Sequence, residues 1–189
     1  MTATAVKKGE ERAIQIDPSS TEEDLEIEEG GSATVFIANN PKLTFSAKLS
    51  GRGAALNVIG RLRGIGDMRQ EITLKAILQA PDTRCRVDMR TALADTSASF
   101  FDGLIRMEEG AKNAEGHLSY RALLMSPGAR AKPIPRLEIL TREVASAGHA
   151  ASVGKIDEEQ LFYLQSRGLS RKEAEALIVE GFLAISKMA

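Results

Sequence analysis

The chain has 189 residues, which is enough for one well-buried core but a tight fit for two ordinary domains. Its formal net charge of −1 and its pI of about 6.2 argue against a nucleic-acid partner and against an anionic membrane surface. A single cysteine, Cys85, excludes an intramolecular disulfide, and the aromatic content of 4% without Trp argues against a base-stacking surface.

Membrane-spanning and secretory segments are not indicated either. No uninterrupted apolar run has the length that a bilayer requires, and residues 1–20 lack the apolar core of a secretory signal. The sequence therefore predicts a cytoplasmic protein.

The first part of the chain, residues 1–30, is polar and dense in charge, with an acidic cluster from Glu22 to Glu29. This composition is typical of a solvated or loosely ordered terminal segment. We therefore predict a polar N-terminal arm over 1–30, with the core of the protein beginning at residue 31.

From 31 to 144 the chain consists of short β-type runs separated by Gly, Asn and Pro. The runs "KLTFSAKL" (42–49) and "EITLKAIL" (71–78) alternate in part between apolar and polar residues, as half-buried strands do. The sequence therefore predicts a mainly β core over this range.

A weak internal repeat accompanies these runs. "LEIEEGGSA" (25–33), "LIRMEEGAK" (104–112) and "LLMSPGAR" (123–130) each join an apolar strand to polar residues, a glycine and a small residue. Stacked parallel coils need this order, because glycine permits the turn that follows each strand. An antiparallel sandwich would have similar strand lengths, so the repeat alone favours a β-solenoid only slightly.

The C-terminal part, 145–189, has a different pattern. Residues 145–154, "ASAGHAASVG", are small, and we expect them to form a flexible connecting loop. Two helices are predicted at about 157–167 and 171–187, and in the second of them apolar residues recur at three- and four-residue spacing. The apolar face of the second helix would comprise Ala174, Leu177, Ile178, Gly181, Phe182 and Ile185, and the two helices would pack through Leu161, Leu164, Leu177 and Phe182.

The ends of the predicted helices carry capping signals. Asp157 is followed three residues later by Gln160, and Ser170 by Glu173, so each pair predicts a capping box. Gly168 lies between the helices, where a glycine can adopt the left-handed conformation that ends a helix.

Common catalytic and nucleotide-binding motifs are not found in the sequence. Neither GxxxxGK[ST] nor GxGxxG occurs, and HExxH, CxxC and GxSxG are also absent. No nucleophile–base pair is evident, so we predict that the chain is not an enzyme and does not bind ATP.

The C-terminal sequence resembles a known family. "HAASVGKIDEEQLFYLQSRGLSRKEAEALIVEGFLA" is similar to the C-terminal region of the SufB/SufD family, scaffold subunits of an iron–sulfur cluster assembly machine. The resemblance continues upstream through "FFDGLIRMEEGAKNAEGHLSYRALLMSPGARAKPIPRLEI" (100–139), where it is of the SufD type. It implies a shortened SufD-like member, with a parallel β-helix core at 31–144 followed by a small helical pair.

The family implies a non-catalytic scaffold that takes part in iron–sulfur cluster assembly through protein contacts. In the family, the C-terminal helical region docks the ABC-type ATPase SufC. Phe162, Tyr163 and Arg167 are residue types enriched at interface hot spots, and we predict that they bind this partner. Because a solenoid ends in unpaired strand edges, we also expect a homodimer or a SufB-like second chain, and neither nucleic acid nor membrane as a partner.

His149 is the candidate metal ligand. It matches a histidine that the family associates with nascent cluster assembly, and a neutral imidazole is a competent iron ligand. The ligand-type neighbours of the SufB pattern are replaced here by Ala147, Gly148 and Ala150, and the position of the cluster-related cysteine of SufB falls at about Tyr120. One cysteine per chain cannot supply the four thiolates of a typical cluster. We therefore expect no firmly bound cofactor and at most a transient iron–sulfur cluster.

Two alternatives to the scaffold remain open. One is a metal-handling dimer in which two copies of His149 hold iron, and the other is a stand-alone β-solenoid interaction module that has lost cluster chemistry. For the remaining candidates we expect a turn-bridging hydrogen bond at His117, a buried inert thiol at Cys85 and a solvated charge at Arg90.

Overall fold

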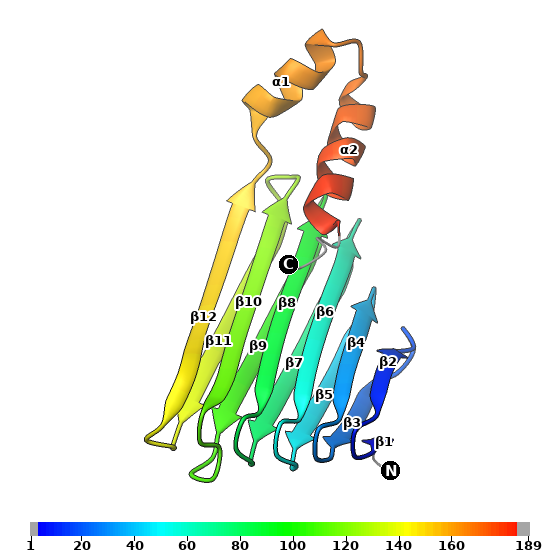
Figure 1. Cartoon of the computed structure of the whole chain (residues 1–189). Helices are drawn as coiled ribbons and strands as arrows, with labels where there is room; N and C mark the ends of the chain where they lie inside the picture. Colours follow the sequence, from blue (N-terminus) through cyan, green and yellow to red (C-terminus); the bar gives the residue numbers. More distant parts are fainter. Residues whose placement is uncertain (1–3, 185–189) are drawn as a thin grey trace.

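The computed structural model describes residues 4–184, which form a parallel β-solenoid followed by two helices (Figure 1). The chain alternates between two facing sheets, and every strand pairing is parallel. The predicted fold class, a mainly β protein with a parallel β-helix core and a C-terminal helical pair, is confirmed.

Each sheet contains every second strand of the chain. The first sheet runs in the order β1 (Thr4–Val6), β3 (Glu22–Ile27), β5 (Lys42–Leu49), β7 (Arg69–Leu78), β9 (Ala98–Met107) and β11 (Arg130–Ile139). The second runs in the order β2 (Glu11–Gln15), β4 (Ser32–Ala38), β6 (Ala55–Gly64), β8 (Arg84–Leu93), β10 (Ala114–Leu124) and β12 (Val144–Lys155).

Alternation along the strands and the register between coils build the core. In β7, for example, every second residue is buried, so one face of the strand points inward and the other outward. The parallel register then stacks equivalent residues of successive coils. One inward column consists of Val35, Val58, Val87 and Leu118, all of them buried, and it continues to His149 in β12.

One corner of the solenoid is built from left-handed residues. Gly9, Gly30, Gly53, Asp82 and Asn113 all have φ between 56° and 70°. Each of them donates its backbone N–H to a carbonyl of the next coil, at 2.7–3.0 Å. Only Gly, Asn and Asp adopt this conformation readily, which explains the residue types at this corner.

The predicted polar arm over residues 1–30 is wrong. This segment contains β1, β2 and β3, and Val6, Leu25 and Ile27 are buried in the common core. The charged residues mislead because in a strand they occupy the outward positions between buried ones. Some of them pair across coils, as Lys7 does with Glu28 at 2.8 Å.

The predicted loop at 145–154 is also wrong, so the core does not end at residue 144. This segment is β12, which pairs with β10 over almost its whole length. The pairing needs only backbone N–H and C=O groups, so small side chains do not prevent it. The solenoid therefore extends from β1 to Lys155.

The helices are close to their predicted positions. They are α1 (Glu158–Ser166) and α2 (Arg171–Leu183), and the predicted extension of the second helix to residue 187 falls partly outside the described residues. Neither helix is both long enough and apolar enough to cross a membrane. In Figure 1 the end of α2 lies against the second sheet, beside β8 and β6.

The capping predictions are largely confirmed. Ser170 accepts a hydrogen bond from the N–H of Glu173, whose carboxylate accepts in return from the Ser170 N–H, so the capping box is formed. Asp157 caps α1 by accepting from the N–H of Glu159, one residue earlier than a capping box requires. Gly168 has φ +97°, as a left-handed helix end should.

The packing predicted for the helices is only partly correct. Leu161 of α1 and Ala174 of α2 are buried, whereas Leu177 is 50% exposed. Leu183, which is not part of the predicted face, is buried, and α2 contacts β8 of the solenoid. Ile185, the last residue assigned to that face, lies outside the described part of the chain.

Candidate functional site

The outer face of β6, β8, β10 and β12 carries polar residues in rows that cross the strands. Arg61, Arg90 and Arg121 are register partners on adjacent strands and form one row. Adjacent parallel strands are separated by about 4.8 Å, so the bases of these three cationic side chains stand close together. A row of like charges is unfavourable unless other groups offset it.

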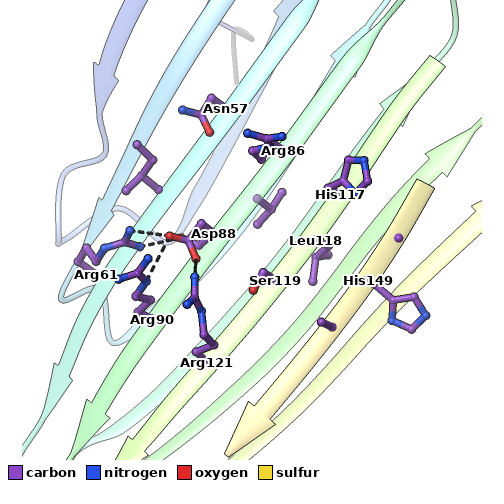
Figure 2. Close-up of a pocket in the computed structure, with 14 residues that line it drawn as sticks. Asn57, Arg61, Arg86, Asp88, Arg90, His117, Leu118, Ser119, Arg121 and His149 are labelled. Carbon is purple, nitrogen blue, oxygen red and sulfur yellow. Dashed lines mark hydrogen bonds and ion pairs between the residues drawn. The ribbon is translucent and has the colours of Figure 1, made fainter. Parts of the chain in front are cut away.

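Two further rows lie beside the arginines on the same face. The middle row lies two residues before the arginines on each strand and consists of Ile59, Asp88, Ser119 and Ala150. The third row lies two residues before the middle row and consists of Asn57, Arg86, His117 and Gly148. Together with the arginine row they line a groove of ≈ 1020 Å³ (Figure 2). This groove, called the arginine groove below, is the main candidate site.

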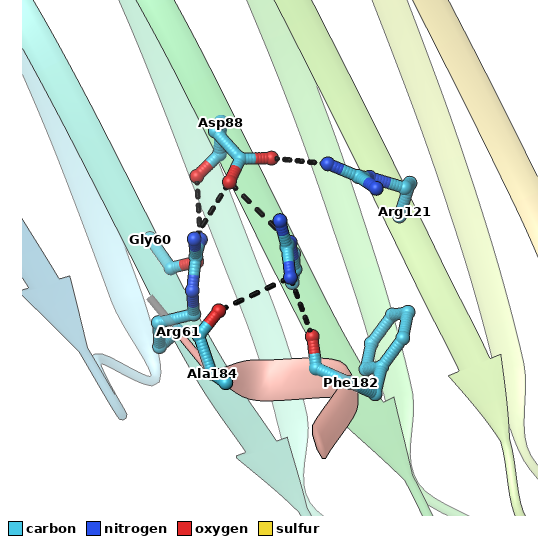
Figure 3. Close-up of polar contacts among 7 residues, drawn as sticks. Gly60, Arg61, Asp88, Arg121, Phe182 and Ala184 are labelled. Carbon is cyan, nitrogen blue, oxygen red and sulfur yellow. Dashed lines mark hydrogen bonds and ion pairs between the residues drawn. The ribbon is translucent and has the colours of Figure 1, made fainter. Parts of the chain in front are cut away.

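Asp88 offsets part of the positive charge. Its Oδ2 accepts from Arg61 Nη2 at 2.6 Å and lies 3.3 Å from Arg90 Nε, while its Oδ1 accepts from Arg121 Nη2 at 3.1 Å (Figure 3). The side chains of Arg61, Arg90 and Asp88 are 14%, 11% and 13% exposed, and that of Arg121 is 45% exposed. Three guanidinium groups therefore share one largely buried carboxylate.

The pKa values in this cluster follow from burial and charge. Burial alone would raise the pKa of the Asp88 carboxyl, but the hydrogen bond from Arg61 and the nearby guanidinium charges outweigh it, so the pKa is lowered. Burial lowers the pKa of Arg61, although its bond to Asp88 opposes this effect. Asp88 is therefore held in its charged form at neutral pH.

Arg90 connects the groove to the C-terminal helices. Its Nη1 donates to the backbone carbonyls of Phe182, at 2.9 Å, and Ala184, at 3.1 Å (Figure 3). The last carbonyls of a helix lack partners within the helix and carry partial negative charge, so a cation there is stabilising. The expectation that Arg90 is a solvated charge is wrong, because it anchors the end of α2 to β8.

His117 and His149 lie on opposite faces of their sheet. His117 faces the groove, where its Nε2 is 2.9 Å from the hydroxyl of Ser146 on β12, so its hydrogen bond joins two adjacent strands and does not bridge a turn as predicted. His149 belongs to the inward column that ends in the last coil, and its side chain is exposed there. Both histidines nevertheless line the arginine groove (Figure 2).

The other metal-related residues do not form a ligand cluster with His149 in the described part of the chain. Within residues 4–184 no three His, Cys, Asp or Glu side chains are placed to hold a metal ion. Cys85 is buried, and burial raises the pKa of its thiol to about 12, so the prediction of an inert thiol agrees with its surroundings. Tyr120 is in the core, donates to the Ser99 hydroxyl at 3.0 Å and stacks on Phe101.

The residues predicted to bind a partner are exposed on α1 and at its C-cap, Arg167. Phe162 is 74% and Tyr163 is 56% exposed. Arg167 lies over the Tyr163 ring, 5.2 Å from its centroid, and its Nη2 donates to the Tyr163 hydroxyl at 3.3 Å. We call Phe162, Tyr163 and Arg167 the α1 patch.

The last coil of the solenoid leaves two strand edges without partners in the described chain. β11 pairs only with β9, and β12 pairs only with β10. Exposed apolar side chains accompany these edges, since Ile139 and Val153 are each 44% exposed and Leu140 is 47% exposed. Unpaired edges with apolar neighbours favour the addition of another strand.

Comparison with known proteins identifies the family. Residues 12–182 match the family model described as SUF system FeS cluster assembly, SufBD core domain. The chain belongs to the SufBD core family. The matched range contains the arginine groove, the last coil and nearly all of both helices, so these features are part of its SufBD core.

Individual relatives agree with this assignment. The chain is 35% identical over 127 residues to the iron–sulfur cluster assembly protein SufD of Bacillus subtilis, which covers 67% of the chain and 28% of that protein. It is 38% identical over 125 residues to a SufBD family protein of Mycobacterium leprae, and this match covers 65% of the chain and 30% of the relative. It is 37% identical over 95 residues to SufD of Escherichia coli, and this match covers 50% of the chain and 22% of the relative. In each case the match covers less than a third of the relative.

Sequence reasoning did not find the arginine groove of this SufBD core. Nothing in the sequence pattern singles out Asp88, and Arg90 is predicted from it only as a solvated charge. The available signal was the recurrence of arginine once per coil, at positions that the register later aligns with Arg61. The sequence predicts the alignment of these arginines only when the number of residues in each coil is known.

Proposed function

We propose that this chain is a non-catalytic scaffold subunit that takes part in iron–sulfur cluster assembly in the cytoplasm. It would act through contacts with an ABC-type ATPase and with a second scaffold chain. The observation that carries the proposal is the SufBD core match over residues 12–182, which includes both surfaces suited to such contacts. These are the α1 patch and the open last coil.

The α1 patch is suited to the ATPase contact. Phe162 presents a large apolar surface to solvent, and burying it against a partner would be favourable. Arg167 is already held against Tyr163, so little side-chain freedom is lost when the pair binds. Aromatic and arginine side chains arranged in this way are typical of interface hot spots.

A direct binding measurement tests this contact. The partner is the SufC-like ATPase of the same organism, and the variant carries Tyr163→Ala with Arg167→Ala. We expect Kd to increase about tenfold or more, because hot-spot truncations have effects of this size. Gln165→Ala is the matched control, since Gln165 is exposed on the same helix outside the patch. Equal Kd values for the double variant and the control would remove the patch from the interface.

The open last coil is suited to a second scaffold chain. Among residues 4–184, β11 and β12 are the end strands of their sheets, and a second chain would pair with their open edges while covering Ile139 and Val153. In an interface with two-fold symmetry, one substitution appears on both sides. Val153→Glu should therefore place two carboxylates in the same contact and weaken the pair.

Light scattering across micromolar concentrations tests this pairing. We expect the wild type to dimerise and Val153→Glu to shift it toward monomer. Ile65→Glu is the control, because Ile65 is also exposed but lies in the turn between β6 and β7. A wild type that stays strictly monomeric, alone and with a SufB-like chain, would contradict the proposal.

A metal-handling dimer is the second candidate, favoured by the position of His149. Its side chain is exposed in the last coil, so two copies joined through that coil would bring two imidazoles to one interface. Such a pair could hold iron or a transient cluster as cargo. Its neighbours Ala147, Gly148 and Ala150 offer no further side-chain ligands, so the remaining ligands would have to come from elsewhere.

Anaerobic reconstitution with iron and sulfide, followed by visible absorption, distinguishes the two candidates. Metal handling through His149 requires colour in the wild type that is reduced in His149→Ala. Equal absence of colour in the wild type and His149→Ala would eliminate the metal-handling candidate and leave the scaffold.

A further inference from the structure

The arginine groove carries more positive charge than its own residues neutralise. Four guanidinium groups line it, those of Arg61, Arg86, Arg90 and Arg121, whereas Asp88 is the only carboxylate among the lining residues of the described chain. Both Asp88 oxygens are already occupied by guanidinium groups. The site therefore has an excess of cationic hydrogen-bond donors on a concave surface.

Two of the four arginines have structural roles. Arg61 donates Nη1 to the carbonyls of Gly60, at 2.7 Å, and Asp88, at 2.9 Å, and Nη2 to the Asp88 carboxylate. Arg90 donates Nη1 to the end of α2 and directs Nε toward Asp88. Both side chains are less than 15% exposed, so they contribute charge to the groove but few free donors.

The other two arginines have free donors. Arg86 is exposed and makes no hydrogen bond or ion pair with any residue between 4 and 184, and Arg121 makes a single bond, to Asp88. Figure 2 shows Arg86 and Arg121 on either side of Ser119, on the same face of the sheet. A guanidinium group has five N–H donors, so most of those on Arg86 and Arg121 are available to a ligand.

We propose that the arginine groove binds a small phosphorylated molecule, with its phosphate group between Arg86 and Arg121 and in reach of the Ser119 hydroxyl. A phosphate group carries a charge of about −1.5 to −2 at neutral pH and three strong acceptor oxygens, which match the planar forks of two arginines. The charge of the ligand would also offset the repulsion within the arginine row.

The size and lining of the groove favour a ligand larger than inorganic phosphate. Its volume of ≈ 1020 Å³ is in the range of small-molecule sites. Ile59 and Ala150 lie on the same face as Ser119 and provide apolar surface for the rest of the molecule. The chain as a whole has a net charge of −1, which disfavours a nucleic-acid strand as the ligand.

Calorimetric titration with inorganic phosphate and with adenosine monophosphate tests the proposal at low ionic strength. We expect saturable binding of one ligand per chain, with adenosine monophosphate at least as tight as phosphate. Arg86→Gln and Arg121→Gln should each weaken binding about tenfold, because each removes charge-assisted hydrogen bonds. Arg142→Gln, which removes an exposed charge from the turn between β11 and β12, should change Kd by less than about twofold.

Several outcomes would overturn the inference. They are the absence of saturable binding at millimolar concentrations of both probes, equal effects of Arg86→Gln and Arg142→Gln, and weaker binding of adenosine monophosphate than of phosphate. Tighter binding of hexaglutamate than of either probe, lost in Arg86→Gln, would assign the groove to an acidic protein segment instead. Arg86 is exposed and has no hydrogen bond or ion pair with residues 4–184, so we expect Arg86→Gln to fold like the wild type. None of these outcomes depends on the proposed scaffold role.

Discussion

Asp88→Asn tests whether one carboxylate holds the arginine row together. The variant keeps the shape of the side chain but removes its charge, leaving Arg61 and Arg90 as largely buried cations without a counter-ion. Two guanidinium charges at the spacing of adjacent strands repel each other by about 3 kcal/mol under the screening typical near a protein surface. Breaking a buried ion pair from one side costs about 3–5 kcal/mol, whereas the exposed Arg121 contributes little.

We therefore expect the free energy of unfolding to fall by about 2–4 kcal/mol and Tm to fall by about 5–15 °C. Chemical and thermal denaturation followed by circular dichroism, in a buffer without phosphate, measure both quantities. Asp102→Asn is the matched control, because Asp102 pairs with Arg136 at 2.6 Å on the other sheet but Arg136 is 49% exposed. In this control the free energy of unfolding should fall by about 0–1 kcal/mol. If the free energy of unfolding falls no further in Asp88→Asn than in Asp102→Asn, burial and charge do not explain the stability of the arginine row.

Three further predictions follow from the same contacts. Because the pKa of the Asp88 carboxyl is lowered in the folded protein, its contribution to stability is present above its ordinary pKa of 3.8 and is lost as the pH falls below that value. The free energies of unfolding of the wild type and Asp88→Asn should therefore converge in acid denaturation series. Arg90→Gln should increase hydrogen exchange across α2, because the helix end loses its anchor, while Arg84→Gln on the same strand should not, since Arg84 pairs only with an exposed glutamate. Cys85 should not react with a thiol reagent at pH 8 until the protein unfolds, because it is 2% exposed and burial raises its pKa to about 12; reaction at the rate of a free thiol would contradict this burial.

Short-range signals predicted the helical region well. The capping box of Ser170 and Glu173 and the left-handed Gly168 depend on residues only a few positions apart, so the chain encodes them locally. The family resemblance likewise depends on contiguous motifs, and the SufBD core match confirmed it. The exposure of Phe162 and Tyr163 agrees with their selection as surface residues, although their partner is a proposal.

Segments whose structure depends on neighbouring coils were predicted less well. The charged residues of β3 and the small residues of β12 do not look like strands in isolation. Each becomes a strand because an adjacent coil offers backbone groups in register, β5 to β3 and β10 to β12. Backbone pairing of this kind is independent of side-chain type, so composition alone misassigns these two segments.

The arginine groove also combines features that are encoded locally with features that depend on neighbouring coils. The sequence by itself determined the arginines, the capped helices and the family, because these depend on residue identity and on short spacing. Only the tertiary structure decided that Arg61, Arg90 and Arg121 stand in one row around Asp88, and that the end of α2 rests on Arg90. The physical reason is that these contacts join residues about one coil or more apart, and the register of the coils aligns them.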